Sequence, residues 1–341
     1  MTPHLPRVSV GMPVYNGERY VKEAIDSVLS QTFTDFELVI SDNASTDRTQ
    51  EICESYCSRD PRIRYSRNPR NVGGSQNFTR VFELSRAPYF KWASHDDLCA
   101  PSFLEKSVEV LDAHPSVVLC YPRSALIDQY GAVIADHEAG CDLRSGRSSD
   151  RVRQLLMEGS THCFPSFGLI RREALKKTTL LAPYISSDQP LLLQLAIMGK
   201  FYELTECLFF FREHPERSVW QSKTFAERLA WYDPKRGSRI QLPRWRIVFE
   251  FLRSIAGAEI NWREAWASYI LVMKWCRWHR APLIRDLSMA ARQLAAIMFG
   301  LPAILDQDGS PPVKGATGFH QDSATDTFAA ARSASGGDGK V

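Results

Sequence analysis

The alternation of strands and helices in the first hundred residues constrains the fold of this chain most. Four short runs rich in β-branched and aromatic residues are separated by segments whose apolar residues recur at helical spacing. The four predicted strands are residues 8–14, 37–40, 63–65 and 89–93. This order predicts an α/β fold with a doubly wound, mostly parallel, Rossmann-like central sheet that is flanked by helices.

Composition changes along the remainder of the chain and predicts two further parts. A looser pattern of strands and helices continues to residue 218, with an apolar helix that opens at Asp188 and a strand at residues 201–211. Residues 219–305 are rich in Trp and Arg and predict a basic helical extension at the C-terminal side. Residues 306–341 contain Gly, Ser, Ala, Thr and Asp with almost no large apolar groups, which is typical of a disordered tail.

Two adjacent carboxylates, Asp96 and Asp97, follow the fourth predicted strand in the run KWASHDD. The carboxyl ends of strands in an open α/β sheet face the ligand crevice, and unpaired carboxylates are too costly for a core. Hard oxygen ligands at that place suit Mg²⁺ or Mn²⁺ that holds the phosphates of a substrate. The alternative is that the pair caps the helix that opens near Pro101.

Another carboxylate, Asp42, ends the second predicted strand. In the crevice such a group accepts hydrogen bonds from a nucleobase or a ribose hydroxyl. The alternative is a turn aspartate that bonds to its own backbone. We interpret Asp42 as a ligand residue, and Asp47 as a structural residue in the first turn of the next helix, where the macrodipole favours it.

The run VSVGMPVYNGERYVKEAIDSVLSQTFTDFELVISDNASTDRT resembles the opening of family 2 glycosyltransferases. The resemblance continues through RNVGGSQNFTRVFELSRAPYFKWASHDD and, more weakly, through SSDQPLLLQLAIMG and FFFREHPERSV, and it covers roughly residues 1–218. It implies the GT-A fold and the transfer of a sugar from a nucleotide-sugar donor with inversion. Residues 1–218 are then the catalytic domain.

The resemblance also implies roles for individual residues. Those implied for the nucleotide site are Pro13, Tyr15, Asn16, Asp42, Gly73 and Asn77. Gly73 alternatively forms a turn, and Asn77 alternatively caps a helix. The metal motif of the family, two aspartates separated by one residue, aligns with Ser94-His95-Asp96, so that a serine replaces the first aspartate. Asp96 is then the metal ligand, and Asp97 organises the loop or a metal-bound water.

Three residues late in the predicted domain complete the implied site. Asp188 aligns with the catalytic acidic residue of the family and is the expected general base for the acceptor hydroxyl. Its alternative is a helix cap beside Pro190. Arg212 and His214 resemble an element that reaches the donor diphosphate and the metal, with imidazole as a third ligand. A loop histidine without such a context is more often solvated.

Charge and cysteine content bound the partners and the compartment. The net charge is +3, and no nucleic-acid-binding module accompanies the basic residues, so we expect no nucleic-acid partner. The eight cysteines are scattered without a CxxC pair, and no secretory signal is seen, which predicts a cytoplasmic protein. The run KWCRWHR predicts either peripheral contact with an anionic membrane, at the inner face of the plasma membrane, or packing on the catalytic domain.

We therefore expect an inverting glycosyltransferase that depends on Mn²⁺ or Mg²⁺ and uses a nucleotide-diphosphate sugar, with a UDP-sugar as the expected donor. The expected acceptor is a glycan or a lipid-linked molecule in cell-surface polysaccharide or glycoconjugate assembly. The motif QLPRW at residues 241–245 matches processive polysaccharide synthases, but no spanning segments follow it, so we expect one sugar per encounter.

Two other classes of protein remain as alternatives. The replacement of the first metal-motif aspartate by Ser94 suggests a catalytically weak nucleotide-sugar-binding or scaffold protein. A doubly wound sheet also suits a nicotinamide-dependent oxidoreductase. The second alternative is disfavoured, because no GxGxxG follows the first predicted strand.

Overall fold

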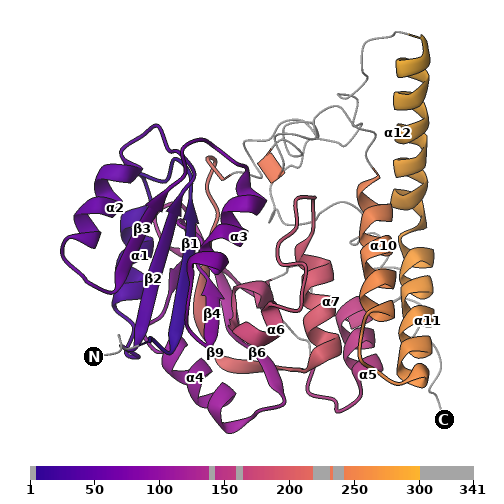
Figure 1. Cartoon of the computed structure of the whole chain (residues 1–341), viewed down its shortest axis with the longest axis horizontal. Helices are drawn as coiled ribbons and strands as arrows, with labels where there is room; N and C mark the ends of the chain where they lie inside the picture. Colours follow the sequence, from indigo (N-terminus) through magenta and orange to yellow (C-terminus); the bar gives the residue numbers. More distant parts are fainter. Residues whose placement is uncertain (1–4, 138–142, 159–163, 218–230, 233–241, 300–341) are drawn as a thin grey trace, which may run out of the picture.

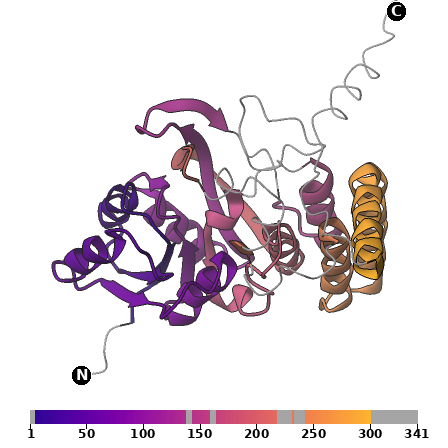
Figure 2. The same ribbon diagram turned by 90° about the horizontal axis from the view of Figure 1, so that it is seen from above.

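The computed structural model describes residues 5–137, 143–158, 164–217, 231–232 and 242–299 (Figure 1). An α/β body occupies one end of the molecule, and three long C-terminal helices stand at the other end (Figure 2). The predicted tail at residues 306–341 lies outside the described residues, as does most of the predicted extension before residue 242.

The first four strands form a parallel sheet, as the alternating pattern predicts. They are β1 (Val8–Val14), β2 (Phe36–Asp42), β3 (Ile63–Arg67) and β4 (Tyr89–Trp92). β1 lies between β2 and β4, and its register pairs Val8 with Phe36 on one side and with Tyr89 on the other. Every residue of β1, β2 and β4 is buried, because central parallel strands are covered on both faces.

The second half of the sheet is mixed. Its strands are β5 (Leu98–Cys99), β6 (Val117–Ile127), β7 (Val133–His137), β8 (Leu169–Arg171) and β9 (Lys200–Arg212). The short β8 is antiparallel to both β4 and β6, whereas β9 runs parallel to β6 and antiparallel to β5. The whole sheet has the order β3-β2-β1-β4-β8-β6-β9-β5, and β7 pairs with β6 outside this path.

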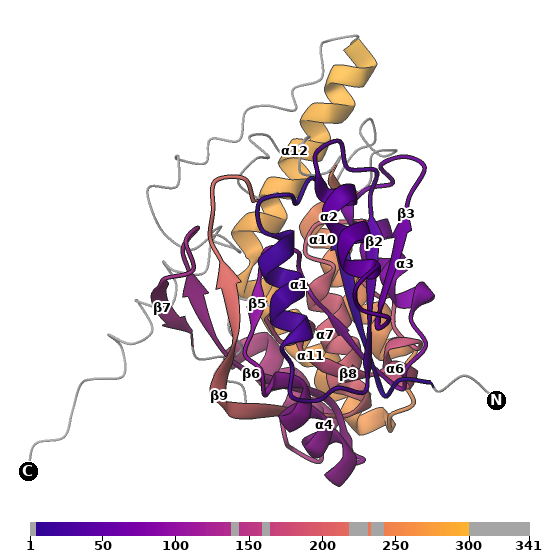
Figure 3. The same ribbon diagram turned by 90° about the vertical axis from the view of Figure 1, so that its left-hand side faces the viewer.

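Helices cover both faces of the sheet (Figure 3). One face carries α1 (Val21–Leu29), α2 (Thr49–Cys57) and α4 (Phe103–Ala113), which share a core cluster with Val10 and Met12 of β1. The other carries α3 (Gly74–Leu84), α6 (Arg172–Leu175) and α7 (Asp188–Met198), which pack with Phe90 and Trp92 of β4. Successive strand residues point to opposite faces, so the buried strands supply both cores.

The C-terminal extension consists of α10 (Pro243–Ala256), α11 (Trp262–Trp278) and α12 (Arg280–Phe299). A third core cluster joins Phe251 of α10 and Trp275 of α11 to Leu193 of α7 and to Val152 of α5 (Ser148–Arg153). The extension is therefore attached to the α/β body through apolar packing on α5 and α7. Among the described residues, no helix combines the length and the apolar character needed to span a bilayer.

Candidate active site

The carboxyl ends of the central strands meet along one side of the sheet, which we call the carboxyl edge. β1 and β2 end together there, since Val14 pairs with Asp42, and β4 runs parallel beside β1. β8 is antiparallel to β4 and to β6, so β6 and β9 run in the same direction as β4, and Arg212 reaches the same edge. α7 turns directly into β9, so the N-terminal end of α7, which begins with Asp188, faces this edge as well.

Asp96 lies just beyond β4, where its carboxylate meets an imidazole from the segment after β9. Its Oδ2 is 3.0 Å from Nε2 of His214, and its Oδ1 accepts a hydrogen bond from the Ser94 hydroxyl. Burial raises the pKa of Asp96, but His95, Arg217 and the bonds to His214 and Ser94 outweigh it, so that the pKa is lowered. Asp96 is thus an ionised ligand candidate.

Asp97 has a different environment although it is the next residue. Its Oδ1 accepts the backbone N–H of Arg212 at 3.0 Å, while its Oδ2 is buried without a hydrogen-bond partner. Burial, and then the charge of Asp96, raise its pKa. The pair does not cap the following helix, because α4 begins at Phe103 with Ser102 at its N-cap. The capping alternative is therefore wrong.

The residues beside β4 fit a divalent ion in part. No group of three or more His, Cys, Asp or Glu side chains is arranged as a metal site within the described residues. Two of the three predicted ligands, Asp96 and His214, nevertheless converge, and Nδ1 of His214 is buried without a hydrogen-bond partner. Carboxylate and imidazole together suit Mn²⁺, which takes its remaining ligands from water and phosphate oxygens.

Arg212 is buried, with 1% of its surface exposed, and its guanidinium contacts protein groups on every side. Nε donates to the carbonyl of Asp96 at 2.9 Å, Nη2 to Glu23 Oε2 at 2.7 Å, and Nη1 to the carbonyl of Gln129 at 3.3 Å. The ring of Tyr20 lies 4.9 Å from its guanidinium carbon. In this structure the guanidinium of Arg212 holds the loop that carries Asp96.

Asp42 is fully buried, and both of its carboxylate oxygens are already engaged. Oδ1 accepts the backbone N–H and the hydroxyl of Ser45, at 2.8 and 2.6 Å. Oδ2 accepts the hydroxyl of Tyr65 and a guanidinium N–H of Arg67, each at 2.7 Å. A carboxylate has about four acceptor positions, so contact with a nucleobase requires one of these partners to leave.

Three residues predicted for the nucleotide site lie at the end of β1. Pro13 is buried within the strand, whereas the side chain of Tyr15 is exposed at the carboxyl edge. Asn16 has a left-handed backbone with a φ of 48°, and its Oδ1 accepts the backbone N–H of Thr46 at 2.8 Å. Of the three, Tyr15 presents a free surface to a ligand, and Asn16 shapes the turn.

Gly73 and Asn77 have structural contacts at the start of α3. Gly73 is the N-cap of α3 with a φ of 92°, a conformation that glycine adopts without strain. Asn77 does not cap the helix, because its amide nitrogen donates to the carbonyl of Ser41 at 2.8 Å and its Oδ1 accepts the Ser41 hydroxyl at 2.7 Å. Asn77 therefore ties α3 to the end of β2.

Asp188 is the first residue of α7 and is half-buried. The N-cap position belongs to Ser187, and Oδ1 of Asp188 accepts the backbone N–H of Gln189 at 3.0 Å. Tyr184 lies near enough for the charge of Asp188 to raise its pKa, after the larger effects of burial and Glu250. The N-cap alternative is therefore wrong, because Ser187 holds that position and the Asp188 carboxylate bonds within the first turn.

Sequence reasoning missed two residues that organise the site from α1 and the turn before it. The ring of Tyr20 lies 4.5 Å from that of His214, and Glu23 pairs with the buried Arg212. Tyr20 and Glu23 lie within the run that carries the family resemblance, but their partners are almost two hundred residues away in the chain. No local signal connects them.

Comparison with known proteins assigns the fold and the family. A family model described as Glycosyl transferase family 2 matches residues 9–179, half of the chain. A glycosyltransferase of unknown role from Methanocaldococcus jannaschii is 31% identical over 38% of this chain and 46% of its own length. Chondroitin synthase of Escherichia coli is 30% identical over 39% of this chain and 19% of its own length. The chain thus spans less than half the length of these relatives.

The fold extends beyond the matched segment. The crystal structure of S. aureus TarS 1-349 in complex with UDP superposes with a TM-score of 0.57 at 16% identity, over 81% of this chain and 72% of that one. This confirms the predicted GT-A fold, with its mixed sheet, flanking helices and helical C-terminal region. The family match agrees with the order of motifs in the sequence and with the carboxyl edge. The chain therefore belongs to glycosyl transferase family 2.

Proposed function

We propose that this chain is a metal-dependent, inverting glycosyltransferase that binds a nucleotide-diphosphate sugar, with a UDP-sugar as the expected donor, at the carboxyl edge. The observation that carries the proposal is the convergence of Asp96 and His214, 3.0 Å apart, beside the end of β4. Family membership supports the reaction class. The position of Asp188 at the same edge supports a two-sided site with donor and acceptor halves.

The donor half is proposed to contain Asp96, His214 and Tyr15. A divalent ion bound by Asp96 and His214 would offset the negative charge that develops on the leaving diphosphate. The exposed ring of Tyr15 is a suitable surface for a nucleobase at the end of β1. Asp97 and Arg212 serve this half indirectly, because the bond from the Arg212 backbone to Asp97 fixes the loop that presents Asp96.

Asp42 is proposed to act on the nucleotide through the loop that it orders. Its bonds to Ser45 hold the turn after β2, and its bond to Arg67 is the one most exposed to solvent. If a base does contact Asp42 directly, one of the present partners must leave first, because all the acceptor positions are filled, and Arg67 is the most exposed of them.

Asp188 is the proposed general base. Inverting transfer needs a proton acceptor on the face opposite the leaving diphosphate, where the acceptor oxygen attacks the anomeric carbon. The proton of the acceptor hydroxyl passes to the Asp188 carboxylate as the new glycosidic bond forms and the bond to the diphosphate breaks. The first turn of a helix packed in the core holds this carboxylate at a defined place.

The acceptor is proposed to be a glycan or a lipid-linked molecule of a cell-surface polymer. The similarity to chondroitin synthase supports polymer assembly as the pathway. The QLPRW motif matches processive synthases, but addition of one sugar per encounter is supported by the structural contacts of its residues, of which 242–245 are described. Its Trp245 donates to the carbonyl of Leu283, and the backbone of Arg244 donates to Asp286. These residues join α10 to α12.

The competing proposal is a nucleotide-sugar-binding or scaffold protein that turns over slowly. It is favoured by Ser94, which stands where the family has an aspartate and bonds to the remaining ligand Asp96. The two proposals differ in turnover and agree on donor binding. Measurement of both quantities on the same variants therefore separates them.

The test measures release of nucleoside diphosphate from a panel of nucleotide sugars with Mn²⁺, and donor binding by calorimetry. We expect Asp188→Asn to lower turnover by about 10²- to 10⁴-fold while donor binding is retained. Glu51→Gln, a first-turn carboxylate of α2 on the surface, is the matched control and should behave as wild type. Unchanged turnover in Asp188→Asn would remove that residue from the mechanism.

The metal requirement is tested by chelation and by His214→Ala. We expect EDTA to abolish turnover and Mn²⁺ to restore it, and His214→Ala to raise the Mn²⁺ concentration needed by about 10- to 100-fold. Donor binding without turnover in the wild type, at any metal concentration, would support the scaffold proposal instead.

A further inference from the structure

Helices α11 and α12 form one nearly continuous rod at the edge of the molecule, which we call the C-terminal rod (residues 262–299) (Figure 1). Only His279 separates them, and it still takes part in helical hydrogen bonding: it donates to the carbonyl of Trp275 and accepts from Leu283. Pro282 has no N–H to donate, which accounts for the interruption. The rod is about 55 Å long at 1.5 Å per residue.

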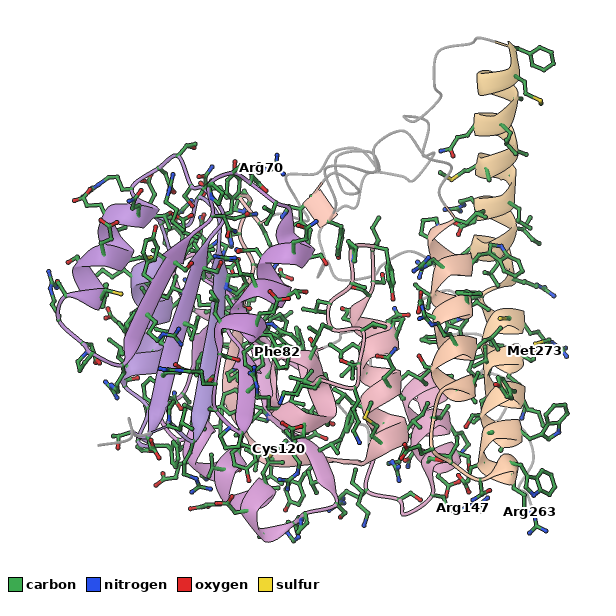
Figure 4. The ribbon with its side chains drawn as sticks, viewed as in Figure 1. Arg70, Phe82, Cys120, Arg147, Arg263 and Met273 are labelled. Atoms are coloured by element: carbon green, nitrogen blue, oxygen red, sulfur yellow. The ribbon has the colours of Figure 1, made fainter. Side chains whose placement is uncertain are left out.

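Each helix of the rod has an exposed apolar face, and the exposed Arg277 and Arg280 lie between the two faces, near the junction of the helices. On α11, Trp262, Trp266 and Met273 are 73%, 64% and 67% exposed, and Ile270 lies beside them. Figure 4 shows Met273 pointing away from the α/β body. A helix turns by about 100° per residue, so these four side chains lie within an arc of about 80°. The buried residues of α11, such as Trp275, lie on the opposite side.

The stripe continues on α12 without a change of side. Its exposed apolar residues follow alternating steps of three and four: Ile284, Leu287, Ala291, Leu294 and Met298. Counted at about 100° per residue through the interruption, they lie within about 40° on either side of Trp262, so their arc overlaps that of α11 in part. We call this set of nine residues the rod stripe. Its width is typical of the apolar face of a helix that lies in a membrane interface.

The exposed charges of the rod, four beside the rod stripe and two within its arc near the junction of the helices, have one sign. Six cationic residues of the rod are exposed: Arg263, Lys274, Arg277, Arg280, Arg285 and Arg292. Its two carboxylates are withdrawn from the surface. Glu264 bonds to Ser148, Ser149 and Arg147 of the neighbouring segment, and Asp286 is buried and accepts the backbone N–H of Arg244.

We propose that the C-terminal rod lies on an anionic lipid surface, with the rod stripe among the acyl chains and the cations toward lipid phosphates. Indoles prefer the interfacial region of a bilayer, and arginine and lysine near it gain from anionic headgroups. A second copy of this chain is the less favourable occupant, because a rod packed on an identical rod brings two cationic rims together. This inference does not depend on the proposed glycosyl transfer.

The test is flotation of the full chain with vesicles of equal parts phosphatidylcholine and phosphatidylglycerol. We expect the wild type to float at low salt, to float far less at about 500 mM salt, and to stay at the bottom with phosphatidylcholine alone. Arg263→Gln with Lys274→Gln should weaken partitioning by roughly 25-fold, at about fivefold per cation. Trp266→Gln with Met273→Gln should weaken it by about tenfold or more.

Matched double variants on other surfaces serve as controls. Arg59→Gln with Lys177→Gln removes two exposed cations, and Tyr130→Gln with Ile134→Gln removes two exposed apolar residues, and both should float as wild type. All changed side chains are exposed, so thermal melts should be unchanged. No flotation of the wild type at low salt, or equal flotation on neutral vesicles, would overturn the proposal. A dimer in sedimentation that Trp266→Gln with Met273→Gln abolishes would overturn it in favour of a second copy.

Discussion

Replacement of Arg212 by methionine separates a structural role of this residue from direct contact with the donor. Met fills much of the same volume but removes the side-chain bonds to the carbonyls of Asp96 and Gln129 and to Glu23. A buried acceptor left without a partner costs about 1–3 kcal/mol, and two carbonyls are affected. Glu23 is more than half exposed and is hydrated instead. The variant no longer has to desolvate a charged guanidinium on folding, and this gain offsets part of the loss.

The net expectation for Arg212→Met is a loss of about 3 kcal/mol in the free energy of unfolding, or about 6–12 °C in Tm at roughly 2–4 °C per kcal/mol. Arg19→Met is the matched control: its ion pair with Glu216 is solvent-exposed, so the loss should stay below about 1 kcal/mol. The assays are urea denaturation and thermal melting, combined with turnover and donor affinity on each variant.

The structural role predicts that turnover and stability fall together in Arg212→Met, because the loop that presents Asp96 loosens. Mn²⁺ affinity should fall with them, since Asp96 is a proposed ligand. The reasoning is refuted if Arg212→Met melts within about 1 °C of wild type while donor affinity collapses. That result would return Arg212 to the diphosphate-binding role that the sequence predicts.

Two further predictions concern parts of the fold that support the site. Burial acts to raise the pKa of Glu264, but bonds from Ser149 and its neighbours lower it to about 2. A group whose pKa is lowered by folding stabilises the folded state at pH values above its unfolded pKa, so Glu264→Gln should lower the free energy of unfolding by about 1 kcal/mol at pH 7. The stability difference between wild type and variant should shrink as the pH falls from about 4.5 to about 2. The same difference in urea denaturation at pH 7 and at pH 2 would contradict this. A Cβ on Gly168 would lie 2.6 Å from the carbonyl oxygen of Cys120, whereas one on Gly146 meets nothing within 4 Å. Gly168→Ala should therefore lose about 2–3 kcal/mol in urea denaturation and Gly146→Ala less than about 0.5, and equal losses would contradict the packing argument.

The periodicity of the sequence was enough to predict the order of strands and helices and the positions of the candidate site residues. Strand and helix periods, with polar residues at strand ends, indicated β1 to β4 and located Asp42 and Asp96 at their ends. These signals are visible in the sequence because a buried strand is built from apolar residues, whereas the residues that follow it at the edge of the sheet can be polar. The same pattern could not predict that β8 lies antiparallel between β4 and β6, because a strand of three residues is too short to show a periodic pattern.

The fold class, the family resemblance and the carboxyl edge therefore follow from the amino-acid pattern. Which polar residues are still free to bind a ligand depends on how the folded chain packs. Asp42 and Arg212 match binding residues in type and position, yet their bonding capacity is taken by Tyr65, Arg67, Glu23 and the Asp96 carbonyl. The physical reason is that a buried polar group must be paired, and its partner is set by packing between segments far apart in the chain.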